Sequence, residues 1–451
     1  MSRFEQTLRE YLTGITAWRP GQLAKGTLAM TTAMGLRTIA QAIVFLIIAR
    51  VLGVEAYGAY AAVLAIAGAL GSFGGSGTQI LMLRDAACDP ACFPLVWGRV
   101  LGAIALSANF LLGIYLLIAW PVLPGGISWS AIMLIGLAEL LFAPLAQAGI
   151  SAYQGNDRIC RAARLLVIPV LYRLSCALIL LPLALLLPDG MQLSLWSALY
   201  AFSALLAALY SMAMVHRDLG LPVRPEFGGL IDYIFGGIAF AFGSAAQKLY
   251  VDLDKTMLAR LSTLEATGAY SAGYRVVDMV IIPLWSILAA AVPRFFRAGD
   301  SGTGSAVVYA LRLLPLPLLY ALGTALVLHF AAGLLPQVLG ASYAESVIVL
   351  QYLAWLPLVS TPRLFLQVAL STSGQQRTVV GVLMAGVIVN VLLNFWLIPY
   401  WGWQGAIVST YAAEILITLL IILLIITNRK DFTENGSQWR NAHERRSLER
   451  K

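Results

Sequence analysis

Charged residues are scarce in this chain. Only 12% of its 451 residues are Asp, Glu, Lys or Arg, the hydrophobic fraction is 60%, and the mean hydropathy is +0.81. Soluble globular domains contain about 25% charged residues, so this composition excludes a large soluble protein. Apolar stretches of about 20 residues, enough to cross a bilayer, recur from end to end without the alternation of barrel strands. The sequence therefore predicts an all-α polytopic membrane protein, because helices satisfy their own backbone groups in lipid.

Motifs for cofactor, metal or nucleotide chemistry are also missing. The four cysteines give no disulfide framework, and the CxxxC pair Cys88 and Cys92 has neither a second pair nor a nearby His. Free thiols are therefore favoured over a zinc site. No GxxxxGK[ST] phosphate loop is present, so ATP is not expected to drive the protein in cis. We expect no cofactor, no metal and no catalytic residue.

The distribution of basic residues predicts the orientation in the membrane. Placing the N-terminus in the cytoplasm puts 21 Lys and Arg on the cytoplasmic side and three, Arg50, Lys255 and Arg260, on the other. Basic residues accumulate in cytoplasmic loops, so both termini are predicted to be cytoplasmic. The net charge of +8 follows from this bias, and no nucleic-acid partner is expected.

Twelve spanning helices are predicted, in two lobes of six. The predicted spans are 26–49, 57–80, 94–119, 128–150, 164–187, 193–215, 233–258, 267–291, 306–331, 343–370, 378–399 and 404–427. The predicted units are an interfacial amphipathic segment at 1–25, lobes at 26–228 and 229–427, and a polar basic cytoplasmic tail at 428–451.

An internal repeat supports the two-lobe interpretation. The stretch 50–60 shares Arg, Glu, Ala, Gly, Ala and Tyr with 260–270 at an offset of 210 residues. Chance matching in an Ala- and Gly-rich chain is the alternative, but Glu and Arg are rare in this composition. Six spans is an even number, so both halves enter the bilayer in the same direction. This pattern predicts parallel repeats around a central cavity.

Ionisable side chains inside predicted spans are the candidate site residues, because each is costly in lipid unless it is paired or hydrated. Arg37 lies in the middle of the first span, and Lys248 lies at matching depth in the second half. The substrate-binding candidates are Arg37, Gln41, Lys248, Arg275, Arg363 and Gln367. The ion-coupling candidates are Glu139, Asp252, Asp278 and Glu414.

Structural roles compete with these functional ones. The pairs Arg275 with Asp278 and Lys248 with Asp252 are spaced for ion pairing along one helix and would also serve to hold helices together. Arg173 is expected to snorkel toward the cytoplasmic end of its span.

Three motifs resemble a known transporter family. They are LGVEAYG at 52–58, DLDKTML at 252–258 and GAYSAGYR at 268–275. The chain resembles Wzx-type lipid-linked oligosaccharide flippases, which handle O-antigen and related polysaccharides. These belong to the multidrug/oligosaccharidyl-lipid/polysaccharide (MOP) exporter superfamily. The resemblance covers the whole length.

The resemblance implies a V-shaped transporter in the bacterial inner membrane, not an enzyme. Its substrate would be an undecaprenyl-pyrophosphate-linked glycan, moved from the cytoplasmic to the periplasmic leaflet by alternating access. Its other partners would be membrane lipids and polysaccharide-assembly proteins. An inside-negative potential assists outward movement of an anion by about 2.3 kcal/mol per charge per 100 mV, and ion antiport is the alternative drive.

Two other functions stay open. A multidrug exporter of the same superfamily is the first alternative, although cationic drugs would favour an acidic cavity. A membrane-embedded glycosyltransferase or polymerase is the second, supported only by the DxD match of Asp252 and Asp254.

Overall fold

In the computed structural model, residues 22–427 are described except 187, 189, 225–226 and 301. The helices of the first half are α2 (Gln22–Gly71), α3 (Thr78–Cys88), η1 (Pro90–Cys92), α4 (Phe93–Val122), α5 (Trp129–Leu137), η2 (Ala138–Phe142), α6 (Ala143–Gly155), α7 (Ile159–Ala184) and α8 (Gln192–Leu219). The interfacial N-terminal segment lies outside these residues except at its last four positions, and the basic tail predicted at 428–451 lies wholly outside them.

The second half contains the remaining helices. They are α9 (Phe227–Leu261), α10 (Leu264–Asp300), α11 (Thr303–Leu313), α12 (Pro315–Ala331), η3 (Ala332–Leu334), α13 (Leu335–Leu339), η4 (Ala341–Tyr343), α14 (Glu345–Leu353), α15 (Leu356–Thr372), α16 (Gln376–Trp401) and α17 (Trp403–Thr427).

The described residues contain ten helical segments long and apolar enough to cross a membrane. The first, Leu28–Gly71, is 44 residues long, and Gly53 bends it at φ 72° and ψ 174° into two spans. The 35-residue helix α9 supplies a further span, although its polar residues lower its hydropathy. The predicted all-α, twelve-helix architecture is confirmed.

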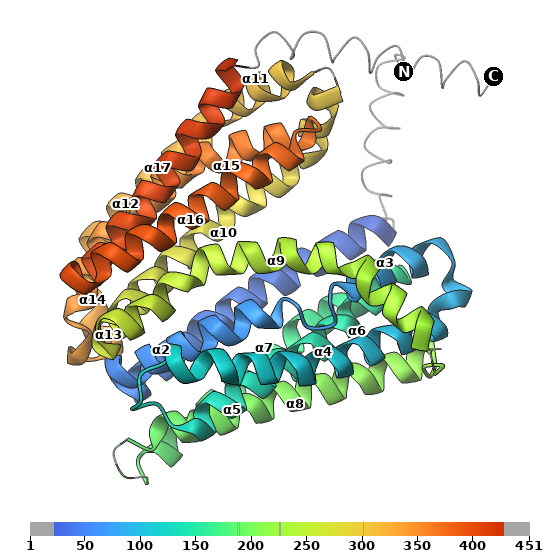
Figure 1. The fold of residues 1–451 in the computed structure, drawn as a ribbon, viewed down its shortest axis with the longest axis horizontal. Coiled ribbons are helices and arrows are strands. Elements are labelled where there is room, and N and C mark those ends of the chain that lie inside the picture. The colour runs from blue at the N-terminus through green and yellow to red at the C-terminus, as the bar shows by residue number, and fades with distance from the viewer. Residues whose placement is uncertain (1–21, 187, 189, 225–226, 301, 428–451) are drawn as a thin grey trace, which may run out of the picture.

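Two lobes diverge from a common edge (Figure 1). One lobe contains α2 to α8 and the other α10 to α17, while α9 packs against α2, α3 and α4 as well as α10 and α16. We call the edge where the lobes meet, near Gly53 and Leu264, the closed side. We call the edge that carries Gln22 and Thr427 the open side, because the lobes separate toward it.

The two copies of the repeat pack on each other at the closed side. A Cβ on Gly58 would overlap the carbonyl oxygen of Leu264, and a Cβ on Gly268 would overlap that of Val54. Both pairs of positions are related by the offset of 210 residues. Such a reciprocal contact is what an approximate twofold axis produces. Glycine is required here because the α2 and α10 backbones approach too closely for a side chain.

The second span is interrupted, which the sequence analysis did not predict. Helix α2 ends at Gly71, and α3 begins at Thr78 after a turn in which Gly75, Ser76 and Gly77 all have positive φ. The Gly75 amide donates to Ser107 Oγ at 2.8 Å. Glycine tolerates this conformation, and the partner satisfies backbone that would be costly in lipid.

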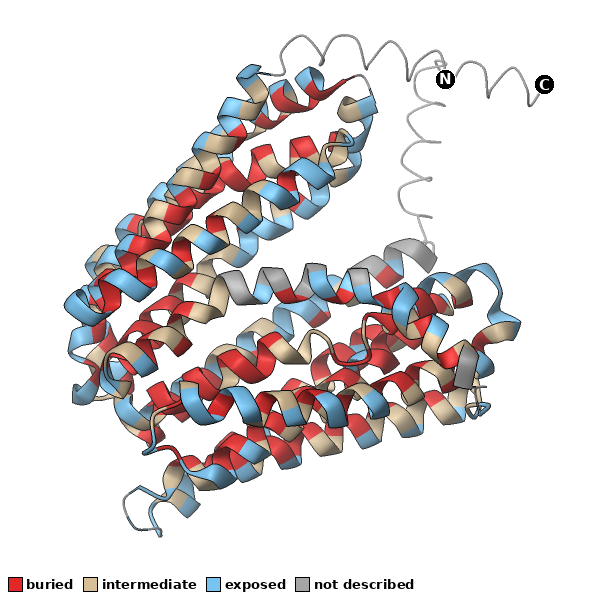
Figure 2. Ribbon diagram, in the orientation of Figure 1, coloured by how far each residue is buried: buried red, intermediate tan, exposed pale blue. Residues whose placement is uncertain are grey.

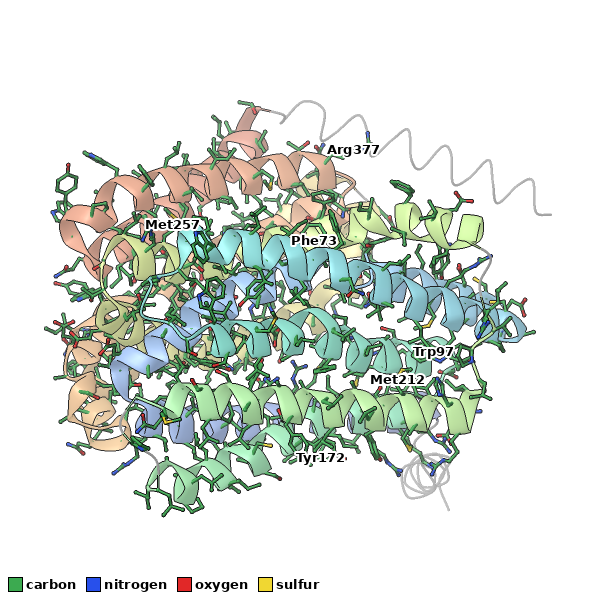
Figure 3. The ribbon with its side chains drawn as sticks, turned by 60° about the horizontal axis from the view of Figure 1, so that its bottom comes forward. Phe73, Trp97, Tyr172, Met212, Met257 and Arg377 are labelled. Carbon is green, nitrogen blue, oxygen red and sulfur yellow. The ribbon has the colours of Figure 1, made fainter. Side chains whose placement is uncertain are left out.

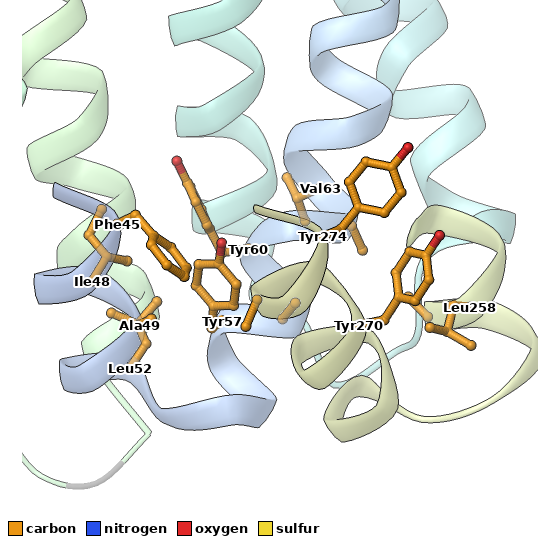
Figure 4. Close-up of a cluster of buried hydrophobic side chains, with 14 of the residues drawn as sticks. Phe45, Ile48, Ala49, Leu52, Tyr57, Tyr60, Val63, Leu258, Tyr270 and Tyr274 are labelled. Carbon is orange, nitrogen blue, oxygen red and sulfur yellow. The ribbon is translucent and has the colours of Figure 1, made fainter. Parts of the chain in front are cut away.

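The interior and the outer surface differ as a membrane protein requires. Buried residues line the inner faces of both lobes, while exposed residues follow their outer faces (Figure 2). Aromatic side chains of α2 and α10, including Tyr57, Tyr60, Tyr270 and Tyr274, are buried in one cluster at the closed side (Figure 4). In Figure 3, Trp97 and Met212 lie together at one end of the first lobe, where a second cluster forms.

Candidate substrate cavity

A cavity of about 400 Å³ lies among α2, η2, α6, α7, α8, α9 and α10. Its charged lining residues are Arg37, Glu139, Arg173, Lys248, Asp252, Lys255, Arg275 and Asp278. Five of these are cationic and three are carboxylates, so their formal sum is +2. Gln41, Gln147 and several tyrosines add further polar groups. The cavity therefore offers an anion both charge and hydrogen-bond donors.

Seven of the ten candidate residues lie together in this cavity. The lining includes Arg37, Gln41, Glu139, Lys248, Asp252, Arg275 and Asp278. Arg37 and Lys248 come from α2 and α9, so the repeat register brought residues 211 positions apart to one site. Their roles in binding and coupling stay predictions.

The other three candidates lie elsewhere, inside the second lobe. Arg363 on α15 donates to Glu414 on α17 through Nε at 2.6 Å and Nη2 at 3.1 Å. Its Nη1 donates to Gln367 Oε1 at 2.8 Å. Only 8% and 5% of the two charged side chains are exposed. The structure thus gives Arg363 a bidentate carboxylate partner in the lobe interior instead of a place in the lining of this cavity.

The ion pairs expected along single helices differ from those observed. Asp252 pairs with Lys255 at 2.5 Å rather than with Lys248, and Lys255 also lies 4.9 Å from the Tyr274 ring centroid. Within the described part of the chain, no acid lies within 4.0 Å of the side-chain nitrogens of Arg37, Arg173, Lys248 or Arg275. Four cations of the cavity are therefore without an ion-pair partner in that part of the protein.

Glu139 lies on a π-helical turn, η2, between α5 and α6. Such turns displace a residue from the regular helical register and are frequent at functional sites. The Tyr200 hydroxyl donates to Glu139 Oε1. The other carboxylate oxygen lies 3.9 Å, and Lys248 Nζ lies 2.9 Å, from the position of a Cβ on Gly68. The missing side chain of Gly68 thus leaves room for Lys248 to reach toward Glu139.

Two cations of the site were missed by sequence reasoning. Arg173 was expected to snorkel, but α7 begins at Ile159, five residues before the predicted span, so Arg173 lies near mid-helix and lines the cavity. Lys255 was assigned to an outer loop, but α9 continues to Leu261 and keeps it inside. The spacing of Asp252 and Lys255, three residues apart, was the available signal for the second.

The DxD match divides between two environments. Asp252 lies in the cavity beside Lys255, whereas Asp254 is 4% exposed and accepts a hydrogen bond from the Tyr270 hydroxyl. The two carboxylates therefore do not converge on a shared partner.

Comparison of the sequence with known families decides the family. The family described as "Polysaccharide biosynthesis protein" matches residues 23–298. The chain belongs to this family. It is a membrane transporter of the MOP superfamily, as the resemblance of its motifs indicated. No curated protein matches this member of the polysaccharide biosynthesis family in a sequence search.

Solved structures confirm the fold of this polysaccharide biosynthesis family member. It is similar to an inward-facing multidrug resistance MATE family transporter of the MOP superfamily, with a TM-score of 0.69, 13% identity, and coverage of 88% of this chain and 96% of that one. An outward-facing MATE transporter gives a TM-score of 0.57, 14% identity, and coverage of 90% and 96%. A MOP superfamily transporter from Pyrococcus furiosus, described as having a binding pocket of reverse polarity, gives 0.57, 14%, 91% and 96%.

Proposed function

We propose that this protein is a flippase for a lipid-linked oligosaccharide in polysaccharide biosynthesis. Its substrate is an undecaprenyl-pyrophosphate-linked glycan, which it moves from the cytoplasmic to the periplasmic leaflet of the bacterial inner membrane. The net positive cavity carries this proposal, because a pyrophosphate is anionic and arginine offers a planar donor fork to its oxygens. The family match to polysaccharide biosynthesis proteins supports the glycan.

The arrangement of the lobes supports the direction of loading. The TM-score is higher against the inward-facing MATE structure than against the outward-facing one, at 0.69 and 0.57. The open side carries the described chain ends, which the distribution of basic residues assigns to the cytoplasm. In this state the cationic cavity receives substrate from the cytoplasmic leaflet, and rocking of the lobes would expose it to the other side.

The test is an Arg37→Ala substitution in cells whose surface glycan depends on this protein. Loss of one cavity cation is expected to abolish glycan export while the amount of protein in the membrane stays unchanged. Arg377→Ala is the matched control, because Arg377 is exposed at the start of α16 and does not line the cavity (Figure 3). Normal glycan output from Arg37→Ala would remove this residue from the mechanism.

Multidrug export is the second candidate function. The observation that favours it is the similarity to MATE transporters, including the multidrug transporter DinF-BH solved in complex with a ligand, at a TM-score of 0.57 or below, 15% identity, and coverage of 92% and 96%. The three carboxylates of the cavity would attract a cationic drug, but five cations oppose it. Increased drug sensitivity of a deletion strain with unchanged surface glycan would favour this function over the flippase.

A further inference from the structure

Arg173 differs from the other cations of the cavity in how firmly it is held. Its guanidinium carbon lies 4.2 Å from the Tyr200 ring centroid, within the range of a cation–π contact. Its Nε atom is buried and has no hydrogen-bond partner. A buried, charged donor without an acceptor is costly, and a ligand that supplies the acceptor recovers that cost. The protein therefore keeps one oriented donor unused.

The surroundings of Tyr200 explain the orientation. Tyr200 is 1% exposed, and its hydroxyl donates to Glu139 on the π-helical turn. Its ring packs edge to face against Trp196 and Tyr60 at centroid distances of 5.9 and 5.8 Å. The aromatic platform beneath Arg173 is therefore fixed by packing on two sides and by a hydrogen bond on a third. A guanidinium lying on it presents its edge to the cavity.

The remaining cations lack this combination. Arg37 is exposed on the first half of α2, and Lys255 is paired with Asp252. Lys248 is also exposed, and an ammonium on a flexible stem has no fixed donor direction. Among these residues, Arg173 alone joins a packed guanidinium to a buried unpaired donor.

We propose that Arg173 is the residue that recognises the phosphate group of the substrate, with Tyr200 and Glu139 as its positioning residues. The Nε–H and a neighbouring Nη–H donate in parallel to two oxygens of one phosphate, while Arg37, Lys248 and Arg275 supply less directional charge. This inference rests on the proposed function. It adds that specificity for a phosphate depends on the donor fork of one residue and not on the net charge of the cavity.

The experiment measures binding of inorganic pyrophosphate to the purified full-length protein in lipid nanodiscs by calorimetry. Arg173→Gln removes the charge, and Arg173→Lys keeps the charge but loses the fork. Both are expected to weaken the affinity at least tenfold, whereas Arg377→Gln, the matched surface control, leaves it unchanged. Tyr200→Phe keeps the ring but loses the hydrogen bond to Glu139, and is expected to weaken the affinity about threefold.

The thermal stability of each variant without pyrophosphate separates recognition from folding. The proposal expects an unchanged melting temperature and a loss of the stabilisation by pyrophosphate for both Arg173 variants. Wild-type affinity of Arg173→Lys would overturn the proposal, because charge alone would then suffice. If Arg37→Ala weakens binding and Arg173→Gln does not, the proposed function stands and this inference fails. If the wild-type protein binds no pyrophosphate, both fail.

Discussion

Single charged residues in this protein divide into those that face the cavity and those that neutralise each other. Arg275 and Asp278 face the cavity, whereas Arg363 and Glu414 are almost fully buried and share a bidentate contact. The first kind is available to a ligand, and the second kind contributes to how α15 and α17 pack. Depth in the sequence could not separate the two kinds, because both lie within apolar spans.

The buried ion pair should behave as a unit. Glu414→Gln leaves the Arg363 charge buried without a carboxylate, so unfolding is expected to become about 3–5 kcal/mol easier. The double variant Arg363→Met/Glu414→Gln removes both charges and should regain most of that loss. Thermal unfolding in detergent measures this, followed by the tryptophan signal. Equal stability of the single and double variants would show that the charges are not coupled.

At the scale of elements, the contact between α2 and α10 decides the closed side. The backbones approach at Gly58 and Gly268, and the Arg50 Nη1 donates to the Val338 carbonyl oxygen at 2.9 Å near the same edge. The repeated stretch is therefore a contact between lobes, placed where they must separate if the cavity is to open on the other side.

A methyl group at this contact should favour that separation. Gly58→Ala would place a Cβ against the Leu264 carbonyl oxygen, so the closed side is expected to open. Spin labels on Arg50→Cys and Val338→Cys, in a background without the native cysteines, would report a longer distance. Gly35→Ala is the matched control, since a Cβ there meets no atom within 4 Å. An unchanged distance in Gly58→Ala would show that the closed side yields locally instead.

For the whole molecule, the orientation in the membrane can be tested with native cysteines. Cys88 and Cys160 are exposed at the ends of α3 and α7 that face the open side. A membrane-impermeant maleimide is expected to label both in inverted membrane vesicles and neither in intact cells with a permeabilised outer membrane. Cys176 is buried and should stay unlabelled in both preparations. Labelling of Cys88 in intact cells would reverse the proposed direction of transport.

Some of this architecture was readable from the sequence alone. Long apolar runs determine that the chain spans the membrane, because hydrocarbon demands helices whatever their neighbours are. The offset of 210 residues between the repeats determined the two-lobe plan and the equal depth of Arg37 and Lys248. These are properties of length, composition and periodicity, which the chain carries without folding.

The tertiary structure decided which charges meet. Only packing between helices could pair Arg363 with Glu414 and move them away from the cavity, or lay Arg173 over Tyr200. It also placed the repeated glycines face to face at the closed side. Contacts between helices distant in the chain depend on helix rotation and on the exact residue where each helix begins. Hydropathy does not specify either, since lipid-facing and lobe-facing residues are equally apolar.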